Sequence, residues 1–323
     1  NIMADANTYI KIIYGGVIAT VAYNLIASIL RALGDSKTPL YFLIISSVLN
    51  VILDLVFIIN FKMGVAGAAY ATIISQGVSA ILCLIYTYKK FTILRLKKED
   101  FNVKRRYYHK HLKIGIPMAL QFSITAIGIM TVQGALNVFG STVIASYTAA
   151  SKALQLVMQP AITFGVTMAT YCGQNLGAKE YGRIKQGVKE CTKISIITSI
   201  IAGAVLIFLG KYFVMLFISN PDAEILKYAQ QVLSISAIFF IPLGLIFIYR
   251  NALQGIGDSF VPMMAGAYEL IARAAVAFTL PKHFDFIGIC LADPVAWLAA
   301  AIPLGITYFK RIKSLLKHGD IKV

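Results

Sequence analysis

The chain has 323 residues, of which 58% are hydrophobic and only 14% are charged. Soluble globular domains carry about 25% charged residues, so this composition argues against that class. The formal net charge of +16 does not indicate nucleic-acid binding, because the basic residues gather on one side of a predicted set of membrane spans.

The apolar residues occur in runs long enough to cross a bilayer, which needs about 20 mostly apolar residues per helix. Hydrocarbon offers the backbone no hydrogen-bond partner, so spans must be helices or barrel strands, and these runs are too long for barrel strands. We predict an all-α polytopic membrane protein with nine spans. In chain order they cover 9–30, 39–61, 64–88, 112–138, 141–171, 191–217, 225–253, 261–281 and 286–309.

The basic residues predict the orientation of the spans. If the nine spans alternate, most of the 30 Lys and Arg residues lie on the side that holds the C-terminus. Cytoplasmic loops are enriched in Lys and Arg, so residue 1 is predicted outside and the C-terminus in the cytoplasm, in the plasma (inner) membrane. The segment 89–111 is predicted as a basic cytoplasmic linker. It separates the remnant of an N-terminal lobe, 1–88, from a C-terminal lobe, 112–323.

A short motif recurs in register with the spans. Residues 34–39 read Gly-Asp-Ser-x-x-Pro after the first span, and 257–262 repeat this motif after the seventh. A second match joins Gly67 to Gly288 near the starts of the third and ninth spans. Six spans separate each pair, which indicates a parallel repeat of two six-helix lobes. The first lobe would then need three more helices, so we predict a fragment of a twelve-helix protein.

Several segments together resemble the multidrug and toxic compound extrusion (MATE) family. They are 29–39, 49–54, 64–72 and the turn 173–178, and the resemblance covers essentially the whole chain from family helix four to helix twelve. It implies two six-helix lobes around a central cavity, with substrates exported against an inward flow of Na⁺ or H⁺. Thr125 stands where one branch of the family has a Glu in helix seven. The chain is therefore more similar to the DNA-damage-inducible protein F-like branch, which relies on the first lobe.

The sharpest candidate for ion coupling is Asp54, because a carboxylate inside an apolar span is costly. Asn50 lies one helical turn earlier, on the same face. A carboxylate beside an amide suits Na⁺, or a carboxyl that takes up a proton. The alternative is a buried Asp hydrogen-bonded for structure alone. The resemblance adds Thr72 and Asn24 to this cation site and places a further Asp in family helix one, outside this chain.

The second lobe carries three further candidates. Glu269 and Arg273 are spaced to pair with each other on one helix face, or they line the cavity. Lys152 faces the cavity or extends toward the membrane interface. A carboxylate site at Thr125 is not expected.

The sequence predicts a secondary antiporter that exports organic, often cationic compounds in exchange for Na⁺ or H⁺. Its partners are small organic substrates and the lipid bilayer, and a monomer is expected. No GxxxxGK[ST] loop and no disulfide or metal-site spacing occurs, so neither ATP coupling, an enzyme activity nor a cofactor is predicted. Two alternatives stay open. One is a lipid-linked saccharide flippase, which several unpaired basic residues in a cavity would favour, and the other is a membrane-embedded lipid-modifying enzyme. The 323-residue chain could also be inactive by itself.

Overall fold

A computed structural model describes residues 2–95, 97–218 and 221–319, and these are almost entirely helical. The chain divides into two compact units, Asn1–Val103 and Lys104–Val323. Each unit has its own buried apolar core. They are described separately below.

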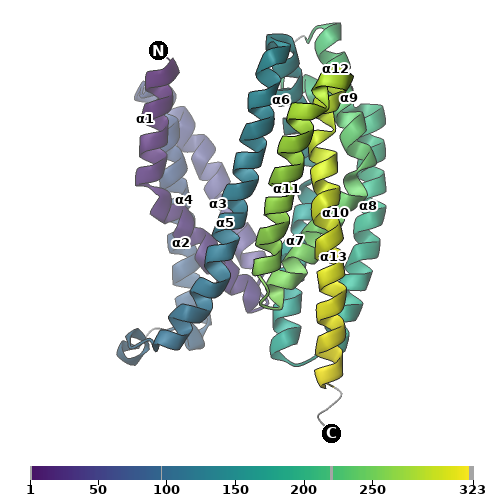
Figure 1. The fold of residues 1–323 in the computed structure, drawn as a ribbon. Coiled ribbons are helices and arrows are strands. Elements are labelled where there is room, and N and C mark those ends of the chain that lie inside the picture. The colour runs from purple at the N-terminus through teal and green to yellow at the C-terminus, as the bar shows by residue number, and fades with distance from the viewer. Residues whose placement is uncertain (1, 96, 219–220, 320–323) are drawn as a thin grey trace. The chain divides into compact units, whose positions relative to one another are not determined.

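Unit 1 is a small helical bundle in which α4 packs against α1, α2 and α3 (Figure 1). Helices α1 and α2 meet at 47°, and the joint is Gly16. A Cβ on Gly16 would collide with the side chain of Ile73 on α4, so only glycine permits this close approach. The elements are α1 Ile2–Gly15, α2 Val17–Ala32, α3 Lys37–Leu55, the π-helical turn Val56–Asn60, α4 Gly64–Lys90, and the 3₁₀ turns Thr92–Leu94 and Lys98–Phe101.

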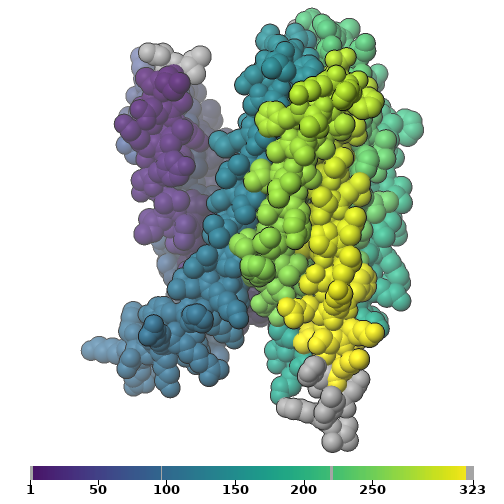
Figure 2. Space-filling view, viewed as in Figure 1, coloured from purple at the N-terminus to yellow at the C-terminus, as the bar shows by residue number. Residues whose placement is uncertain are grey.

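Unit 2 is a larger bundle whose core is dominated by buried Leu, Ile, Val and Ala side chains. Helices α11 and α13 lie side by side, and in Figure 2 their side chains form a continuous packed surface. The elements are α5 Arg105–Leu136, the 3₁₀ turn Asn137–Phe139, α6 Ser141–Val157, α7 Gln159–Gly177, α8 Tyr181–Met215, α9 Ala223–Ile238, α10 Phe240–Gly255, α11 Phe260–Thr279, α12 Pro281–Cys290 and α13 Ala292–Gly319.

Three helix breaks in unit 2 each precede a proline by two or three residues. Proline lacks an amide hydrogen and clashes with the preceding turn, so it favours a break at that position. The break between α9 and α10 bends the pair by 56°. By contrast, Pro117 lies inside the continuous helix α5. The breaks fall at Met158 before Pro160, Phe239 before Pro242 and Leu291 before Pro294.

The number of spans is a correction to the sequence analysis. Among the described residues, six helices are long and apolar enough to cross a membrane, or eight spans if each bent pair, α1–α2 and α9–α10, counts as one. The prediction of nine is wrong by this measure because 141–171 is not one apolar helix. It forms α6 and α7, joined at Met158, and hydroxyl and amide side chains from α6 line a cavity described below.

Two predicted boundaries also shift. Helix α5 begins at Arg105, so the last residues of the predicted linker 89–111 are helical. The final span begins at Ala292 and not at 286, because the helix breaks at Leu291; residues 286–290 belong to the short helix α12, which is itself kinked at Asp285, with φ of 47°.

The two Gly-Asp-Ser turns share one backbone geometry. Gly34 has φ of +91° and Gly257 has φ of +87°, a left-handed conformation that glycine adopts without strain. The next amide in each turn, of Asp35 and of Asp258, donates to the carbonyl five residues earlier, at 2.9 Å in both cases. The sequence repeat is therefore a repeat of structure at these turns.

The Asp35 side chain holds the first turn together. Its carboxylate accepts hydrogen bonds from the Thr38 amide at 3.1 Å and from the Tyr86 hydroxyl at 2.9 Å, and Lys90 Nζ lies 3.5 Å away. Burial by itself raises the pKa of Asp35, but these hydrogen bonds and the Lys90 charge outweigh it and lower the pKa below its usual value. The turn between α2 and α3 is thereby tied to the end of α4.

Asp258 plays the same part in the second turn. Its Oδ1 accepts the Val261 amide at 3.4 Å, and its Oδ2 accepts Nε and Nη2 of Arg311 on α13 at 3.0 and 2.9 Å. In both units the turn carboxylate thus caps the following helix and pairs with a basic residue near the end of a later one.

Candidate functional site

Asp54 and Asn50 lie one turn apart on α3, and both are partly buried. Asp54 Oδ1 and Asn50 Nδ2 are inaccessible to solvent and have no hydrogen-bond partner among the described residues. An unsatisfied buried polar atom costs about 1–3 kcal/mol. Two such atoms side by side on one helix are therefore candidates for contacts with a ligand.

Two hydrogen bonds fix how α3 and α4 face each other. Ser46 Oγ donates to the Ser75 carbonyl at 2.7 Å, and Ser79 Oγ donates to the Phe42 carbonyl at 2.8 Å. This antiparallel register continues one turn along α3 to Asn50 and one turn back along α4 to Thr72. Thr72 therefore lies at the level of Asn50, as the resemblance implies.

The Thr72 hydroxyl oxygen is available to bind a cation or to accept a hydrogen bond. It donates its own hydrogen to the Ala68 carbonyl at 2.9 Å, which leaves its lone pairs for a cation or a donor. One turn further, Gln76 Oε1 is buried and has no partner in the described structure. The sequence analysis missed Gln76, although its position one turn after Thr72 on α4 was a signal for it.

The backbone beside Asp54 is irregular. Helix α3 ends at Leu55 and passes into the π-helical turn Val56–Asn60, closed by the Phe61 amide on the Val56 carbonyl at 3.1 Å. Such turns are rare and occur often at functional sites, since they free carbonyl groups from the regular pattern. Asp54 thus lies at the point where regular hydrogen bonding ends.

Asn24, the fourth predicted member of the site, lies on α2. Asn24 is exposed, and its amide donates to the Thr20 carbonyl at 2.9 Å. The neighbouring Tyr23 donates to the Pro39 carbonyl at 3.0 Å, which sets the depth of this part of α2. Asn50 lies eleven residues further along α3, about 16 Å of helical rise. The membership of Asn24 in the cation site stays a prediction.

Unit 2 contains a cavity of about 350 Å³ between α5, α6, α10, α11 and α13. Its wall combines aromatic rings, amide side chains and four charged residues. The polar and aromatic residues that line it are Gln121, Phe122, Thr125, Gln133, Tyr147, Ser151, Gln155, Phe247, Arg250, Glu269, Arg273, Asp293 and Trp297.

The predicted pairing of Glu269 with Arg273 is wrong. Glu269 pairs instead with Arg250 of α10, and Arg273 Nε donates to Asp293 Oδ1 of α13 at 2.7 Å. Tyr147 of α6 adds a hydrogen bond to Asp293 at 3.1 Å. The partners come from neighbouring helices because in a bundle a side chain meets the facing helices as readily as its own next turn. Both residues nevertheless line the cavity, as one prediction allowed.

The sequence analysis missed two charged residues of this cavity. Arg250 falls within the predicted span 225–253 but was not singled out, and it is only 9% exposed. Asp293 was overlooked because it directly precedes Pro294 near a helix start. Gly128 of α5 also matters here, since a Cβ on it would collide with the Arg273 guanidinium.

Lys152 lies outside the cavity. Its side chain is exposed, and Nζ lies 5.7 Å from the centre of the Phe217 ring, a distance at which a cation is attracted to the ring. Thr125, in contrast, does line the cavity, where its hydroxyl donates to the Gln121 carbonyl at 3.0 Å.

Comparisons with known proteins agree with this architecture. The MatE family model matches residues 1–56 and 114–279. Probable multidrug resistance protein YpnP of Bacillus subtilis is 35% identical over 256 residues, covering 78% of this chain and 56% of YpnP. Probable multidrug resistance protein NorM of Thermotoga maritima is 27% identical, covering 88% of this chain and 62% of NorM.

A solved outward-facing structure of a multidrug resistance MATE family transporter superposes with a TM-score of 0.89. It is 21% identical and covers 95% of this chain and 69% of the solved one, so it shows the likeness of fold. The chain thus spans about three fifths of the length of YpnP and NorM. With the family model matched over most of its length and YpnP more than 30% identical, the chain belongs to the MatE family.

Proposed function

We propose that this protein is a secondary antiporter that exports organic, often cationic compounds in exchange for Na⁺ or H⁺. Family membership and the printed names of YpnP and NorM, both probable multidrug resistance proteins, support transport as the activity. The observation that carries the coupling is local. In an apolar helix, the carboxylate oxygen Asp54 Oδ1 lies buried without a partner among the described residues, one turn from Asn50.

The coupling ion, Na⁺ or H⁺, would bind reversibly at Asp54. Asp54 supplies a negative oxygen, and Asn50 and Thr72 supply amide and hydroxyl oxygens, the ligands that hard cations prefer. The same carboxyl can instead bind a proton, which also removes its charge. Either ion neutralises Asp54 within the apolar bundle, so loading of the site changes the stability of α3 against α4. Asn24, which the resemblance adds, is exposed and bonded to its own helix and stays a candidate fourth member.

The alternative functions have less support. A flippase for charged lipid-linked saccharides calls for unpaired basic residues in a cavity, whereas both arginines of the unit 2 cavity pair with acids. A lipid-modifying enzyme calls for clustered catalytic side chains. Within the described part of the chain, no group of three or more His, Cys, Asp or Glu residues could hold a metal ion.

The finer assignments are also proposals. We place the protein in the cell membrane with its C-terminus in the cytoplasm, because Lys and Arg concentrate on that side of the predicted spans. We also propose that it is a monomer. The two repeated turns support two lobes related by a parallel repeat, of six helices each in a twelve-helix protein. Thr125, in place of a second-lobe carboxylate, supports the DNA-damage-inducible protein F-like branch.

The test is efflux from vesicles that contain the protein. A fluorescent lipophilic cation is loaded, and a Na⁺ or a pH gradient is imposed separately. Export that accelerates with one of the two gradients, compared with protein-free vesicles, supports an antiporter and names its ion. Export that is equal with and without both gradients contradicts the proposal.

A further inference from the structure

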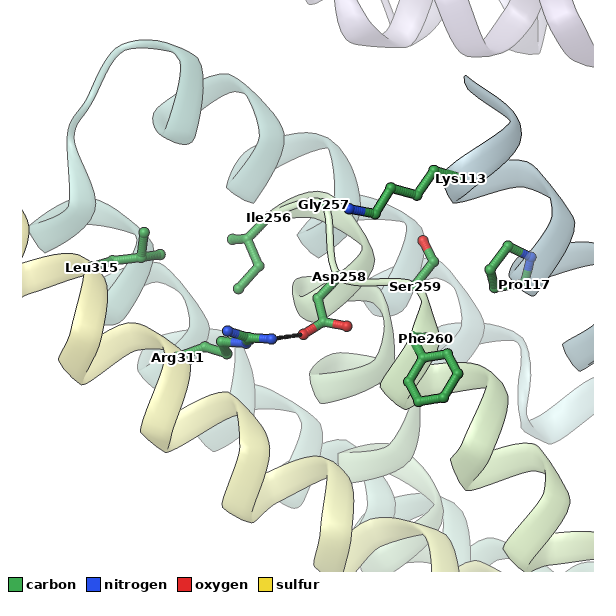
Figure 3. Close-up of a pocket in the computed structure, with 9 residues that line it drawn as sticks. All are labelled: Lys113, Pro117, Ile256, Gly257, Asp258, Ser259, Phe260, Arg311 and Leu315. Atoms are coloured by element: carbon green, nitrogen blue, oxygen red, sulfur yellow. Dashed lines mark hydrogen bonds and ion pairs between the residues drawn. The ribbon is translucent and has the colours of Figure 1, made fainter. Parts of the chain in front are cut away.

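A second, larger pocket lies at the end of unit 2 where α5 begins and α13 ends. It measures about 580 Å³ and is separate from the cavity described above, with which it shares no lining residue. The α10–α11 turn forms its centre (Figure 3). The residues that line it are Lys113, Pro117, Ile256, Gly257, Asp258, Ser259, Phe260, Arg311 and Leu315.

The pocket carries a net positive charge. Arg311 and Asp258 neutralise each other through their bonds at 2.9–3.0 Å. Lys113 of α5 forms no ion pair or hydrogen bond with any described residue, and Figure 3 shows its amine extended toward the turn at Gly257. One unneutralised ammonium group therefore faces the centre of the pocket.

Ser259 supplies an unused donor beside this charge. The residue is only 3% exposed, and its Oγ has no hydrogen-bond partner among the described residues. In Figure 3 its hydroxyl points into the space on the Lys113 side of the turn. Ser259 also directly precedes α11, whose 20-residue length gives its N-terminus a partial positive charge. Three features, namely an ammonium group, a free hydroxyl and a helix N-terminus, thus favour an anion at one place.

In the equivalent turn of unit 1, a tyrosine side chain reaches the turn carboxylate. There Tyr86 reaches the turn carboxylate Asp35 with its hydroxyl at 2.9 Å. Tyr86 precedes the turn's basic partner Lys90 by four residues, and the residue four before Arg311 is Thr307. A small side chain replaces the phenol, so the second copy of the turn keeps an open pocket where the first is closed by its own side chain.

We propose that this pocket binds a phosphate group, as found in an anionic phospholipid headgroup or as free phosphate. The Lys113 ammonium would neutralise the charge, and the Ser259 hydroxyl and the Phe260 amide at the start of α11 would donate to its oxygens. Pro117, Phe260 and Leu315 form an apolar wall beside it, which suits the glycerol and acyl part of a lipid. Bound phosphate would tie α5, α11 and α13 together at this end of unit 2.

The test measures the unfolding temperature of the purified chain in a neutral detergent. Dioctanoyl phosphatidylglycerol, dioctanoyl phosphatidylcholine and inorganic phosphate are titrated separately. The proposal expects saturable stabilisation by phosphatidylglycerol that phosphatidylcholine, with its compensating positive charge, gives only weakly. Stabilisation by inorganic phosphate at similar concentration identifies the free anion as the ligand; its absence identifies the lipid.

Matched variants locate the effect. Lys113→Gln removes the charge in the pocket, whereas Lys110→Gln removes an exposed charge one turn earlier on α5 that does not line it. Loss of the charged Lys113 donor should weaken binding by about tenfold or more, so Lys113→Gln should raise the half-saturating concentration. Ser259→Ala, which removes a neutral donor, should raise it as well, while Lys110→Gln should leave it unchanged. Equal stabilisation of all three variants by the ligand overturns the proposal. So does the absence of stabilisation by both phosphatidylglycerol and inorganic phosphate.

Discussion

Arg273 donates its Nε hydrogen to Asp293 on α13 at 2.7 Å, although Glu269 stands one turn away on Arg273's own helix. Glu269 pairs with Arg250 of α10 instead. The two pairs therefore connect α11 to a different neighbour on each side. A buried charge costs several kcal/mol when its partner is removed, but a pair can be replaced together at little cost.

Replacing Arg273 alone should destabilise unit 2. Arg273→Leu leaves the largely buried Asp293 without its counter-charge, with an expected loss of about 3–5 kcal/mol. The double variant Arg273→Leu with Asp293→Leu should recover most of this loss. Denaturant or thermal unfolding in detergent measures both. As a control, Lys193→Gln breaks an exposed pair with Glu190 and should cost less than about 1 kcal/mol. A double variant no more stable than the single one would show that the pairing is unimportant.

Gly128 should not tolerate a methyl group. Its Cβ would collide with the Arg273 guanidinium, so Gly128→Ala should cost about 1–3 kcal/mol through forced repacking. Gly134 on the same helix has open space around its Cβ position. Gly134→Ala should therefore be neutral or stabilise by up to about 1 kcal/mol, since alanine favours the helix. Unfolding of the two variants side by side measures the difference, and equal stabilities would contradict the close approach.

The helical architecture could be predicted from sequence because apolar run length directly reflects bilayer thickness. The repeated turns could be predicted as well, since left-handed glycine and a capping Asp leave a visible motif. The span 141–171 was mispredicted because some of its polar residues line a cavity. The average hydrophobicity of a segment does not show whether its polar residues line a cavity or mark a break between two helices.

The partners of Glu269 and Arg273 were mispredicted for a different reason. Sequence spacing shows which residues share a helix face, but not which helix faces them. Arg250 and Asp293 are those partners because α10 and α13 pack against α11, and that packing is not contained in the spacing of the residues.

The acid stability of unit 1 should depend on Asp35. Its pKa is lowered in the folded state, whereas the unfolded value is about 3.9. The stabilisation is therefore fully present above the unfolded pKa and is lost as pH falls through the folded pKa. Asp35→Asn should cost about 1–3 kcal/mol at neutral pH and should flatten the loss of stability below about pH 4.

Unfolding free energies measured at neutral and acid pH check this prediction. Glu99→Gln serves as the control, since the Glu99 side chain is exposed and forms no hydrogen bond or ion pair with another described residue. Parallel pH curves for the parent and Asp35→Asn would contradict the role given to the turn carboxylate.

A comparison of Asn50 and Asn24 variants tests which residues of unit 1 belong to the ion site. If Asn50 and Thr72 share the site of Asp54 and Asn24 does not, Asn50→Ala should weaken ion-driven efflux by about tenfold, whereas Asn24→Ala should leave it unchanged. Initial efflux rates as a function of Na⁺ or H⁺ concentration separate the two variants. Equal losses would place Asn24 in the site.

The account depends on Asp54 as the group that binds the coupling ion. The most direct measurement compares two modes of transport by Asp54→Asn in the same vesicles: export driven by an ion gradient, and exchange of labelled for unlabelled substrate without any gradient. The account predicts that exchange persists while acceleration by the gradient disappears. Acceleration equal to that of the parent protein would contradict it.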